Sequence, residues 1–186
     1  MRIIAGGFKN RVIHAPHDKS LDPTSDRVRQ ALFNILGNQI VGARFADLFA
    51  GSGAVGLEAL SRGAERVTFI ENRRPTAEAI RATLASLAVG PERARVWHSD
   101  VFKLEDNPSE WSEWDIAFLD PPGSVKDNFL DVLLERDILA AGSLIIVERP
   151  VDRCPTLRPE MIRLLDQRTY GKTSLFFYAG SFSDGD

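Results

Sequence analysis

Short apolar runs alternate with amphipathic stretches along most of this chain. Four stretches repeat apolar residues at the three- and four-residue spacing of a helix, and they cover residues 26–36, 55–61, 75–88 and 128–135. Five short apolar runs predict strands over residues 45–49, 66–71, 95–97, 115–119 and 143–148. Strands and helices that alternate in this way favour an α/β three-layer sandwich with a mostly parallel sheet.

The first part of the chain departs from this alternation. Residues 2–15 alternate weakly around Gly6, which predicts a short β-hairpin. Thr24 or Ser25 then offers a side-chain oxygen that caps the helix over residues 26–36. One face of this helix carries its apolar residues, which are Val28, Ala31, Leu32, Ile35 and Leu36.

The last part of the chain predicts a second hairpin. Residues 166–170 and 174–178 read as two antiparallel strands, separated by a turn that contains a glycine. Residues 181–186 are polar and small, and we expect a disordered tail there. The chain would then consist of an N-terminal hairpin and helix over residues 1–40 and one α/β domain over residues 41–180.

Composition places the chain among ordinary globular proteins. It has 186 residues, of which 44% are hydrophobic and 26% charged. No run reaches the roughly 18 apolar residues of a membrane-spanning helix, and the first residues lack the apolar core of a signal peptide. The single cysteine, Cys154, excludes an intrachain disulfide. These features predict a cytoplasmic protein.

Charge is distributed unevenly along the chain. The formal net charge is −3, which gives no overall signal for nucleic-acid binding. Residues 1–30 nevertheless carry six Lys or Arg and three Asp, whereas the remaining 156 residues carry 17 basic and 23 acidic residues. A basic N-terminal part can bind phosphates locally on a protein that is acidic as a whole, although ordinary surface scatter would give the same numbers.

The first chemical signal is the segment from Asp47 to Gly56, which follows an apolar run and opens a helical pattern. Gly51, Gly53 and Gly56 match a dinucleotide-type fingerprint, in which glycines let backbone N–H groups approach a ligand. On its own the pattern also suits a simple packing turn. Glu71 ends the next strand, 20 residues after Gly51, where a carboxylate can accept both hydroxyls of a ribose.

Asp47 narrows the choice of cofactor. A carboxylate four residues before Gly51 would repel a diphosphate, but it suits a ligand with a cationic amino-acid tail. S-adenosylmethionine has such a tail and a sulfonium centre as well. Asp100 follows the third predicted strand, where it could receive an adenine amino group or lie in solvent.

The second chemical signal is Asp120-Pro121-Pro122, which follows a buried strand pattern. Two prolines fix the backbone and donate no N–H group, so the carboxylate and nearby carbonyls remain as rigid acceptors. Such acceptors can hold an exocyclic amino group and direct its nitrogen lone pair toward an electrophilic methyl group.

Three stretches of the chain resemble one protein family. Residues 2–7 (RIIAGG), 23–36 (PTSDRVRQALFNIL) and 49–63 (FAGSGAVGLEALSRG) are similar to the bacterial small-subunit ribosomal RNA guanine-N2 methyltransferases of the RsmD family. The likeness covers nearly the whole chain. It implies a Rossmann-like, S-adenosylmethionine-dependent methyltransferase that acts on small-subunit ribosomal RNA or on the assembling small subunit, without a metal or a membrane.

The resemblance also assigns roles to residues. The implied cofactor-binding residues are Asp47, Phe49, Gly51, Ser52, Gly53, Glu71, Asp100 and Val101. The implied catalytic residues are Asp120, Pro121 and Pro122, and Cys154 takes no part. The N-terminal hairpin and helix would help to hold RNA, with backbone contacts from Lys9, Arg11, Arg27 and Arg29.

Two positions depart from the family pattern. Gly123 stands where the family has Tyr or Phe, which can stack on an extruded base, and Asp22 stands where the family has a basic residue. Gly123 leaves open a non-catalytic RNA- or ribosome-binding protein with the same fold. A second alternative is an adenine-N6 methyltransferase of DNA, which uses the same Asp-Pro-Pro chemistry, although the small size of the chain disfavours it. Asp47 and Asp120 disfavour an NAD-dependent oxidoreductase.

Overall fold

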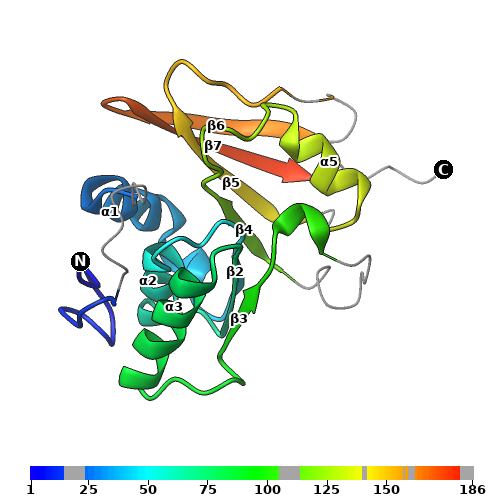
Figure 1. The fold of residues 1–186 in the computed structure, drawn as a ribbon. Coiled ribbons are helices and arrows are strands. Elements are labelled where there is room, and N and C mark those ends of the chain that lie inside the picture. Colours follow the sequence, from blue (N-terminus) through cyan, green and yellow to red (C-terminus); the bar gives the residue numbers. More distant parts are fainter. Residues whose placement is uncertain (15–23, 105–113, 140–141, 157, 159–161, 181–186) are drawn as a thin grey trace. The chain divides into compact units, whose positions relative to one another are not determined.

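The computed structural model describes residues 1–14, 24–104, 114–139, 142–156, 158 and 162–180 (Figure 1). The chain forms two compact units, Met1–Lys103 and Leu104–Asp186. The predicted tail over residues 181–186 lies outside the described residues. The predicted N-terminal part, residues 1–40, belongs to the first unit.

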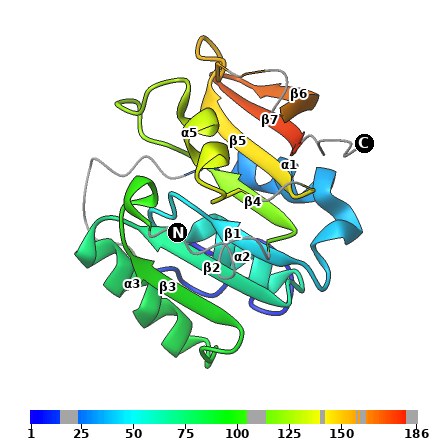
Figure 2. The ribbon, with the colours of Figure 1, turned by 90° about the vertical axis from the view of Figure 1, so that its right-hand side faces the viewer.

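The first unit is built on three parallel strands in the order β3-β2-β1. Its helices α2 and α3 pack against these strands (Figure 2). Gly56 allows the close approach of α2, because a Cβ atom there would lie only 2.3 Å from a ring carbon of Phe69 on β2. The elements are α1 (Asp26–Leu36), η1 (Gly37–Ile40), β1 (Arg44–Asp47), α2 (Ala54–Ser61), β2 (Arg66–Glu71), α3 (Arg74–Ser86), β3 (Ala94–His98) and η2 (Val101–Lys103).

Helix α1 confirms its predicted bounds and three of the five residues expected on its buried face, Val28, Leu32 and Leu36. Ser25 caps it by accepting a hydrogen bond from the Val28 amide, as predicted. The buried residues are Val28, Arg29, Leu32, Phe33 and Leu36. Ile35, which was expected inside, is 38% exposed. The buried stripe follows the spacing 29, 32, 33, 36, because Arg29 makes interior ion pairs and Phe33 packs 6.4 Å from the Phe45 ring.

The predicted N-terminal hairpin is present only as a short antiparallel pairing, in which the Ile3 amide donates to the Arg11 carbonyl and the Ile13 amide to the Met1 carbonyl. Residues 2–14 contain one isolated antiparallel bridge, between Arg2 and Val12, and no ladder. The residues that connect the two arms are bonded to α2, since the Gly7 amide donates to the Ser61 carbonyl and the Phe8 amide to the Ser61 hydroxyl. Gly6 has a φ of +79°, and a Cβ there would collide with the Ser61 carbonyl oxygen. The segment is therefore shaped by α2.

The second unit combines a parallel strand pair with an antiparallel hairpin. Its strands follow the order β4-β5-β7-β6, with β4 and β5 parallel and the other two pairs antiparallel. The predicted closing hairpin is confirmed, although its first strand begins earlier than expected. Residues 163–165 are all exposed in the structure, so neither face of the strand is buried there. Their sequence therefore lacks the alternation of apolar and polar residues that predicts a strand. The elements are β4 (Ile116–Leu119), α5 (Phe129–Glu135), β5 (Leu144–Pro150), β6 (Ile162–Tyr170) and β7 (Thr173–Gly180).

Candidate active site

The glycine turn between β1 and α2 is fixed by Asp47. This side chain is buried, and its Oδ2 accepts a hydrogen bond of 2.9 Å from the Gly56 amide in the first turn of α2. Gly51 and Gly53 have φ values of 52° and 75°, a region that favours glycine, as the sequence suggested. Burial raises the pKa of Asp47 to about 7, opposed by the Gly56 hydrogen bond and reinforced by the negative charge of Glu71. A neighbouring ligand cation would favour the ionised form.

Glu71 is bonded directly to the glycine turn. It ends β2 and is buried, and its two carboxylate oxygens accept 2.8 Å hydrogen bonds from the amides of Gly51 and Arg73. Burial raises the pKa of Glu71, while the Arg73 and Gly51 amides oppose that shift. An ionised carboxylate has about four acceptor positions, so both oxygens retain capacity for a ribose hydroxyl. The structure therefore brings Gly51 and Glu71 together, as their spacing predicted.

Asp100 and Val101 lie where β3 ends. Asp100 is half-buried, and its Oδ1 accepts a 3.0 Å hydrogen bond from the Phe102 amide, while Val101 is buried. The Ser99 amide donates to the Glu71 carbonyl, which joins the ends of β2 and β3. The carboxyl ends of parallel strands are where open α/β sheets bind ligands.

Two half-buried aromatic rings complete the described surroundings of this turn. Phe49, a predicted cofactor residue, lies 6.0 Å from Phe102 between ring centroids, at 58°. Ser52 is buried, with its hydroxyl 3.9 Å from the Met1 sulfur. Sequence reasoning missed Phe102. Its one available signal was an aromatic residue two positions after Asp100.

Asp120, Pro121 and Pro122 follow β4 in the second unit. Asp120 is half-buried, Pro121 is buried and Pro122 is exposed. The Pro121 carbonyl already accepts a 3.2 Å hydrogen bond from Arg149 Nη1, which leaves one lone pair of that oxygen for another donor. Gly123 is exposed, and a Cβ there would meet nothing nearer than Arg153 Nη1 at 3.9 Å, so the backbone has room for a side chain.

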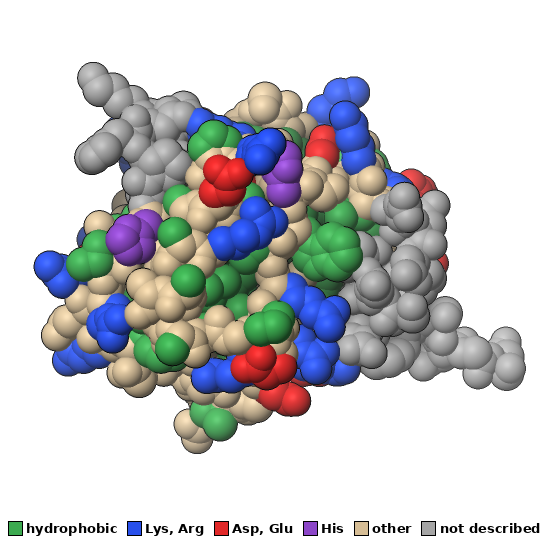
Figure 3. Space-filling model, turned by 60° about the horizontal axis from the view of Figure 1, so that its bottom comes forward, with side chains coloured by type: hydrophobic (Ala, Val, Ile, Leu, Met, Phe, Trp, Pro, Cys, Tyr) green, Lys and Arg blue, Asp and Glu red, His purple; other side chains and the backbone are tan. Residues whose placement is uncertain are grey.

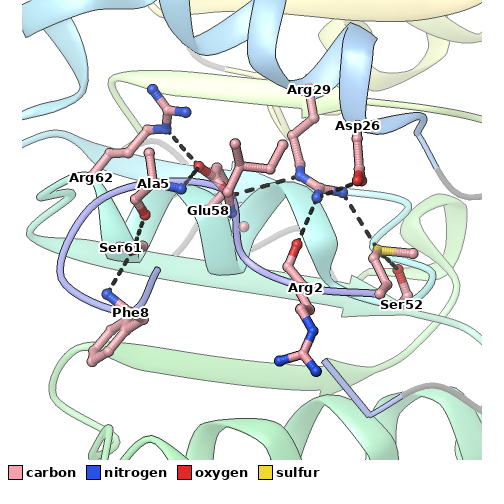
Figure 4. Close-up of polar contacts among 12 residues, drawn as sticks. Arg2, Ala5, Phe8, Asp26, Arg29, Ser52, Glu58, Ser61 and Arg62 are labelled. Atoms are coloured by element: carbon pink, nitrogen blue, oxygen red, sulfur yellow. Dashed lines mark hydrogen bonds and ion pairs between the residues drawn. The ribbon is translucent and has the colours of Figure 1, made fainter. Parts of the chain in front are cut away.

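The four predicted RNA-binding residues divide into two groups. Lys9, Arg11 and Arg27 are exposed, and Arg11 donates a 2.6 Å hydrogen bond to the Ser86 carbonyl at the end of α3. Arg29 is a correction, because its side chain is 0% exposed and cannot reach a phosphate. It donates to the Arg2 carbonyl and pairs with Asp26 and Glu58 (Figure 4). In Figure 3, basic side chains are scattered over the face shown rather than gathered in one patch.

Neither a metal cluster nor a spanning helix is found in the described part of the chain. No group of three or more His, Cys, Asp or Glu side chains there could hold a metal ion. Within the same ranges, no helix is long and apolar enough to cross a membrane.

Comparison with known proteins identifies the class first. The structure resembles the solved putative methyltransferase yhhF of Escherichia coli, with a TM-score of 0.78, 35% identity and 97% coverage of both chains. It also resembles the putative methylase HI0767 of Haemophilus influenzae, with a TM-score of 0.76, 34% identity and coverage of 96% and 97%. The predicted Rossmann-like fold and the class, an S-adenosylmethionine-dependent methyltransferase, are confirmed.

The family follows from the sequence relatives. The family described as "Conserved hypothetical protein 95" matches residues 1–179. "Ribosomal RNA small subunit methyltransferase D" of Haemophilus influenzae is 36% identical over 180 residues, which are 96% of this chain and 93% of that protein. The protein of the same name from Escherichia coli strain K12 is 36% identical over 100% of this chain and 94% of its own length. The chain belongs to this family, the RsmD family.

Proposed function

We propose that this protein transfers a methyl group from S-adenosylmethionine to the N2 amine of a guanine in small-subunit ribosomal RNA. The observation that carries the proposal is the match, over nearly the full length of both chains, to relatives named as methyltransferases of that RNA. The Asp-Pro-Pro loop supports an amine as the acceptor. We further propose that the protein works in the cytoplasm, on ribosomal RNA or on the assembling small subunit.

The cofactor would be held by the first unit. The glycine turn lets backbone N–H groups approach it, Glu71 accepts the ribose hydroxyls and Asp47 faces the cationic amino-acid part. We assign Asp100 to the adenine amino group. Phe49, Ser52 and Val101 are the remaining proposed contacts. The bound cofactor supplies a methyl group activated by the sulfonium, and the protein itself contributes no covalent intermediate.

The target amine would be held by the loop after β4. A guanine N2 amine is a poor nucleophile, because its lone pair is delocalised into the ring. If the Asp120 carboxylate and the Pro121 carbonyl accept hydrogen bonds from the two N–H groups of the amine, the lone pair of its nitrogen is directed toward the methyl group. Positioning and fixed electrostatics of this kind supply most of the rate in such a transfer. The base must leave its stack to enter the site.

RNA backbone contacts are proposed for Lys9, Arg11 and Arg27. All three are exposed, and Lys9 and Arg11 lie on a segment whose backbone is bonded to α2. An attached segment presents its charges without the entropy cost of ordering a loop on binding. These three residues are the proposed source of phosphate contacts on a protein whose formal net charge is −3.

A transfer assay tests this proposal. The protein is incubated with S-adenosylmethionine labelled in its methyl group and with small-subunit RNA, small-subunit particles or duplex DNA, none of which carries the modification. We expect label in RNA or particles, little in DNA, and a loss of label with Asp120→Ala. Label mainly in DNA would favour the adenine-N6 alternative, and RNA binding without transfer would favour a non-catalytic protein.

A further inference from the structure

The loop after β4 is held in shape by two arginines, Arg149 on β5 and Arg153 shortly after that strand ends. We define the acceptor loop as residues 120–127. Arg149 Nη1 donates 3.2 Å to the Pro121 carbonyl, and Arg149 Nη2 donates 3.3 Å to the Val125 carbonyl and forms an ion pair with Asp127. Its side chain is 0% exposed, although it carries a permanent charge.

Arg153 makes a second set of bonds to the same loop. Its Nη1 donates 2.5 Å to the Gly123 carbonyl, and its Nη2 donates 3.2 Å to the Val125 carbonyl and 2.7 Å to Asp127 Oδ1. The carbonyls of residues 121, 123 and 125 therefore each accept a hydrogen bond from an arginine. These bonds, with the one from the Val125 amide to the Pro122 carbonyl, fix the path of the loop.

The chemistry of the loop explains why arginine is used. Pro121 and Pro122 have no N–H group, so side chains can hold this part of the loop only through its carbonyl oxygens. A guanidinium offers five N–H donors in a rigid plane, whereas a lysine ammonium is a single flexible point charge. The Arg149 hydrogen bond, followed by Arg153, also lowers the pKa of Asp127, so that this ion pair is intact at neutral pH.

We propose that Arg149 is a positioning residue for methyl transfer, which aims the Pro121 carbonyl at the target amine by bonding to that carbonyl and to the far side of the loop. This inference rests on the proposed function, because it requires the loop to hold the acceptor amine. A buried charged side chain is costly unless it is paired and hydrogen-bonded, and Arg149 finds these partners in the acceptor loop. Among the described residues its Nε has no hydrogen-bond partner, although its guanidinium also lies 5.6 Å from the Phe129 ring centroid.

The proposal predicts a specific division of kinetic effects. Arg149 bonds to the acceptor loop in the second unit, whereas the proposed cofactor residues belong to the first unit. Loosening the loop should lower kcat and leave cofactor binding intact, because the lost interaction matters only when the amine reacts. A residue with a purely structural role would instead lower stability, cofactor binding and kcat together.

The test compares Arg149→Lys with Arg158→Lys. Arg158 is a matched control from the same unit, because it pairs with Asp131 and Glu135 on α5 and is 46% exposed. We would measure kcat, the KM for S-adenosylmethionine and for RNA, the affinity for S-adenosylhomocysteine by calorimetry, and the Tm. Arg149→Lys should lower kcat at least tenfold with both cofactor constants within twofold of wild type, whereas Arg158→Lys should retain kcat within twofold.

Two results for Arg149→Lys would overturn the inference. One is a wild-type kcat, and the other is a lower kcat that comes with weaker cofactor binding and a lower Tm. If Arg149→Lys does not fold, Asp127→Asn replaces it in the test. This variant keeps both arginines but removes the negative charge that pairs with them, so kcat should fall severalfold. A wild-type kcat for Asp127→Asn would overturn the inference. A wild-type protein that methylates no small-subunit RNA or particle would overturn the proposed function itself.

Discussion

The N-terminal segment (residues 2–14) and the acceptor loop are both irregular pieces of chain held by a buried ionised side chain, but the two ions have opposite sign. Glu58 on α2 holds the first by accepting 2.7 and 3.0 Å hydrogen bonds from the amides of Ile4 and Ala5 (Figure 4). Arg149 holds the second by donating to carbonyls. Glu58 is balanced by Arg62 at 2.7 Å and Arg29 at 3.8 Å, and Arg149 is balanced by Asp127.

The difference follows from the backbone groups that each segment offers. A carboxylate only accepts hydrogen bonds, so it can hold a segment only through its N–H groups. A guanidinium only donates, so it can hold a segment only through its carbonyls. The two prolines of the acceptor loop leave carbonyls alone at that point. The two prolines therefore require a donor at that point of the acceptor loop, whereas the N-terminal segment offers both kinds of group and its Arg2 carbonyl also accepts a hydrogen bond from buried Arg29.

The largest expected effect is on stability, from Glu58→Ala. This variant leaves Arg29 and Arg62 without their buried partner and leaves two amides unsatisfied. Breaking a buried ion pair in this way costs about 3–5 kcal/mol of the free energy of unfolding, measured by urea titration. Glu78→Ala is the control, because Glu78 makes an exposed pair with Arg74, and exposed pairs contribute little to stability. If both variants lose the same free energy of unfolding, Glu58 does not hold the N-terminal segment as described.

The next effect is on catalysis, from Asp120→Ala. Loss of a positioned electrostatic group should lower turnover by about a hundredfold or more in the transfer assay. Affinity for S-adenosylhomocysteine should stay within twofold, since we assign cofactor binding to other residues. Asp152→Ala, at an exposed position after β5, is the control and should keep its turnover. Near wild-type turnover in Asp120→Ala would show that the acceptor loop does not hold the reacting amine.

The proposed RNA contacts of Lys9, Arg11 and Arg27 should affect both the affinity for RNA and the dependence of that affinity on salt concentration. Replacing Lys9, Arg11 and Arg27 together with Gln should weaken RNA binding roughly tenfold at moderate salt and flatten the dependence of log K on log salt, because fewer counterions are released. Fluorescence anisotropy over a salt series measures both quantities. Arg168→Gln, which removes an exposed charge on β6, serves as the single-site control. An unchanged salt slope in the triple variant would place the RNA surface elsewhere.

Asp47 gives the smallest effect and is another carboxylate that holds a backbone amide. Because burial raises its pKa to about 7, it is largely neutral at pH 6 and ionised at pH 8. Affinity for S-adenosylhomocysteine, whose amino-acid part is cationic, should rise severalfold between these values and then level off. Asp47→Asn should abolish the rise in calorimetric titrations. A pH dependence that is the same in both proteins would contradict this role.

Stability should respond to the same group in the opposite sense. The folded-state pKa of Asp47 lies above its unfolded value of about 3.9, so the folded protein binds a proton more tightly. The contribution of Asp47 to the free energy of unfolding is therefore full below about pH 4 and is lost as the pH rises to about 7. Asp47→Asn should remove this part of the slope.

Local signals predicted the parts of the fold and site that depend on neighbouring residues. The bounds of α1 and β2, and the contact of Gly51 with Glu71, follow from periodicity and from the spacing of strand ends. Arg149 gave no such signal, because it lies in an apolar strand and meets Pro121 across 28 positions. Pairings of this range depend on how elements pack.

The N-terminal segment was predicted only in part for the same reason. Its alternation favoured a hairpin and its two arms do pair, but the amides of Ile4 and Phe8 find Glu58 and Ser61 more than 50 positions along the chain. Arg29 looked like a surface charge within a basic stretch, and only the packed structure shows that its side chain is interior. Burial of a charged residue can be predicted from a sequence only when the residue that pairs with it is known.

The identity of the methylated nucleoside is the most direct test of the function that joins these two regions. Small-subunit RNA or particles would be treated with the wild-type protein and isotopically labelled S-adenosylmethionine, digested to nucleosides and separated by chromatography with mass detection. Our account predicts that the label appears in N2-methylguanosine and is lost with Asp120→Ala. Label in N6-methyladenosine, or in any nucleoside other than N2-methylguanosine, would contradict it.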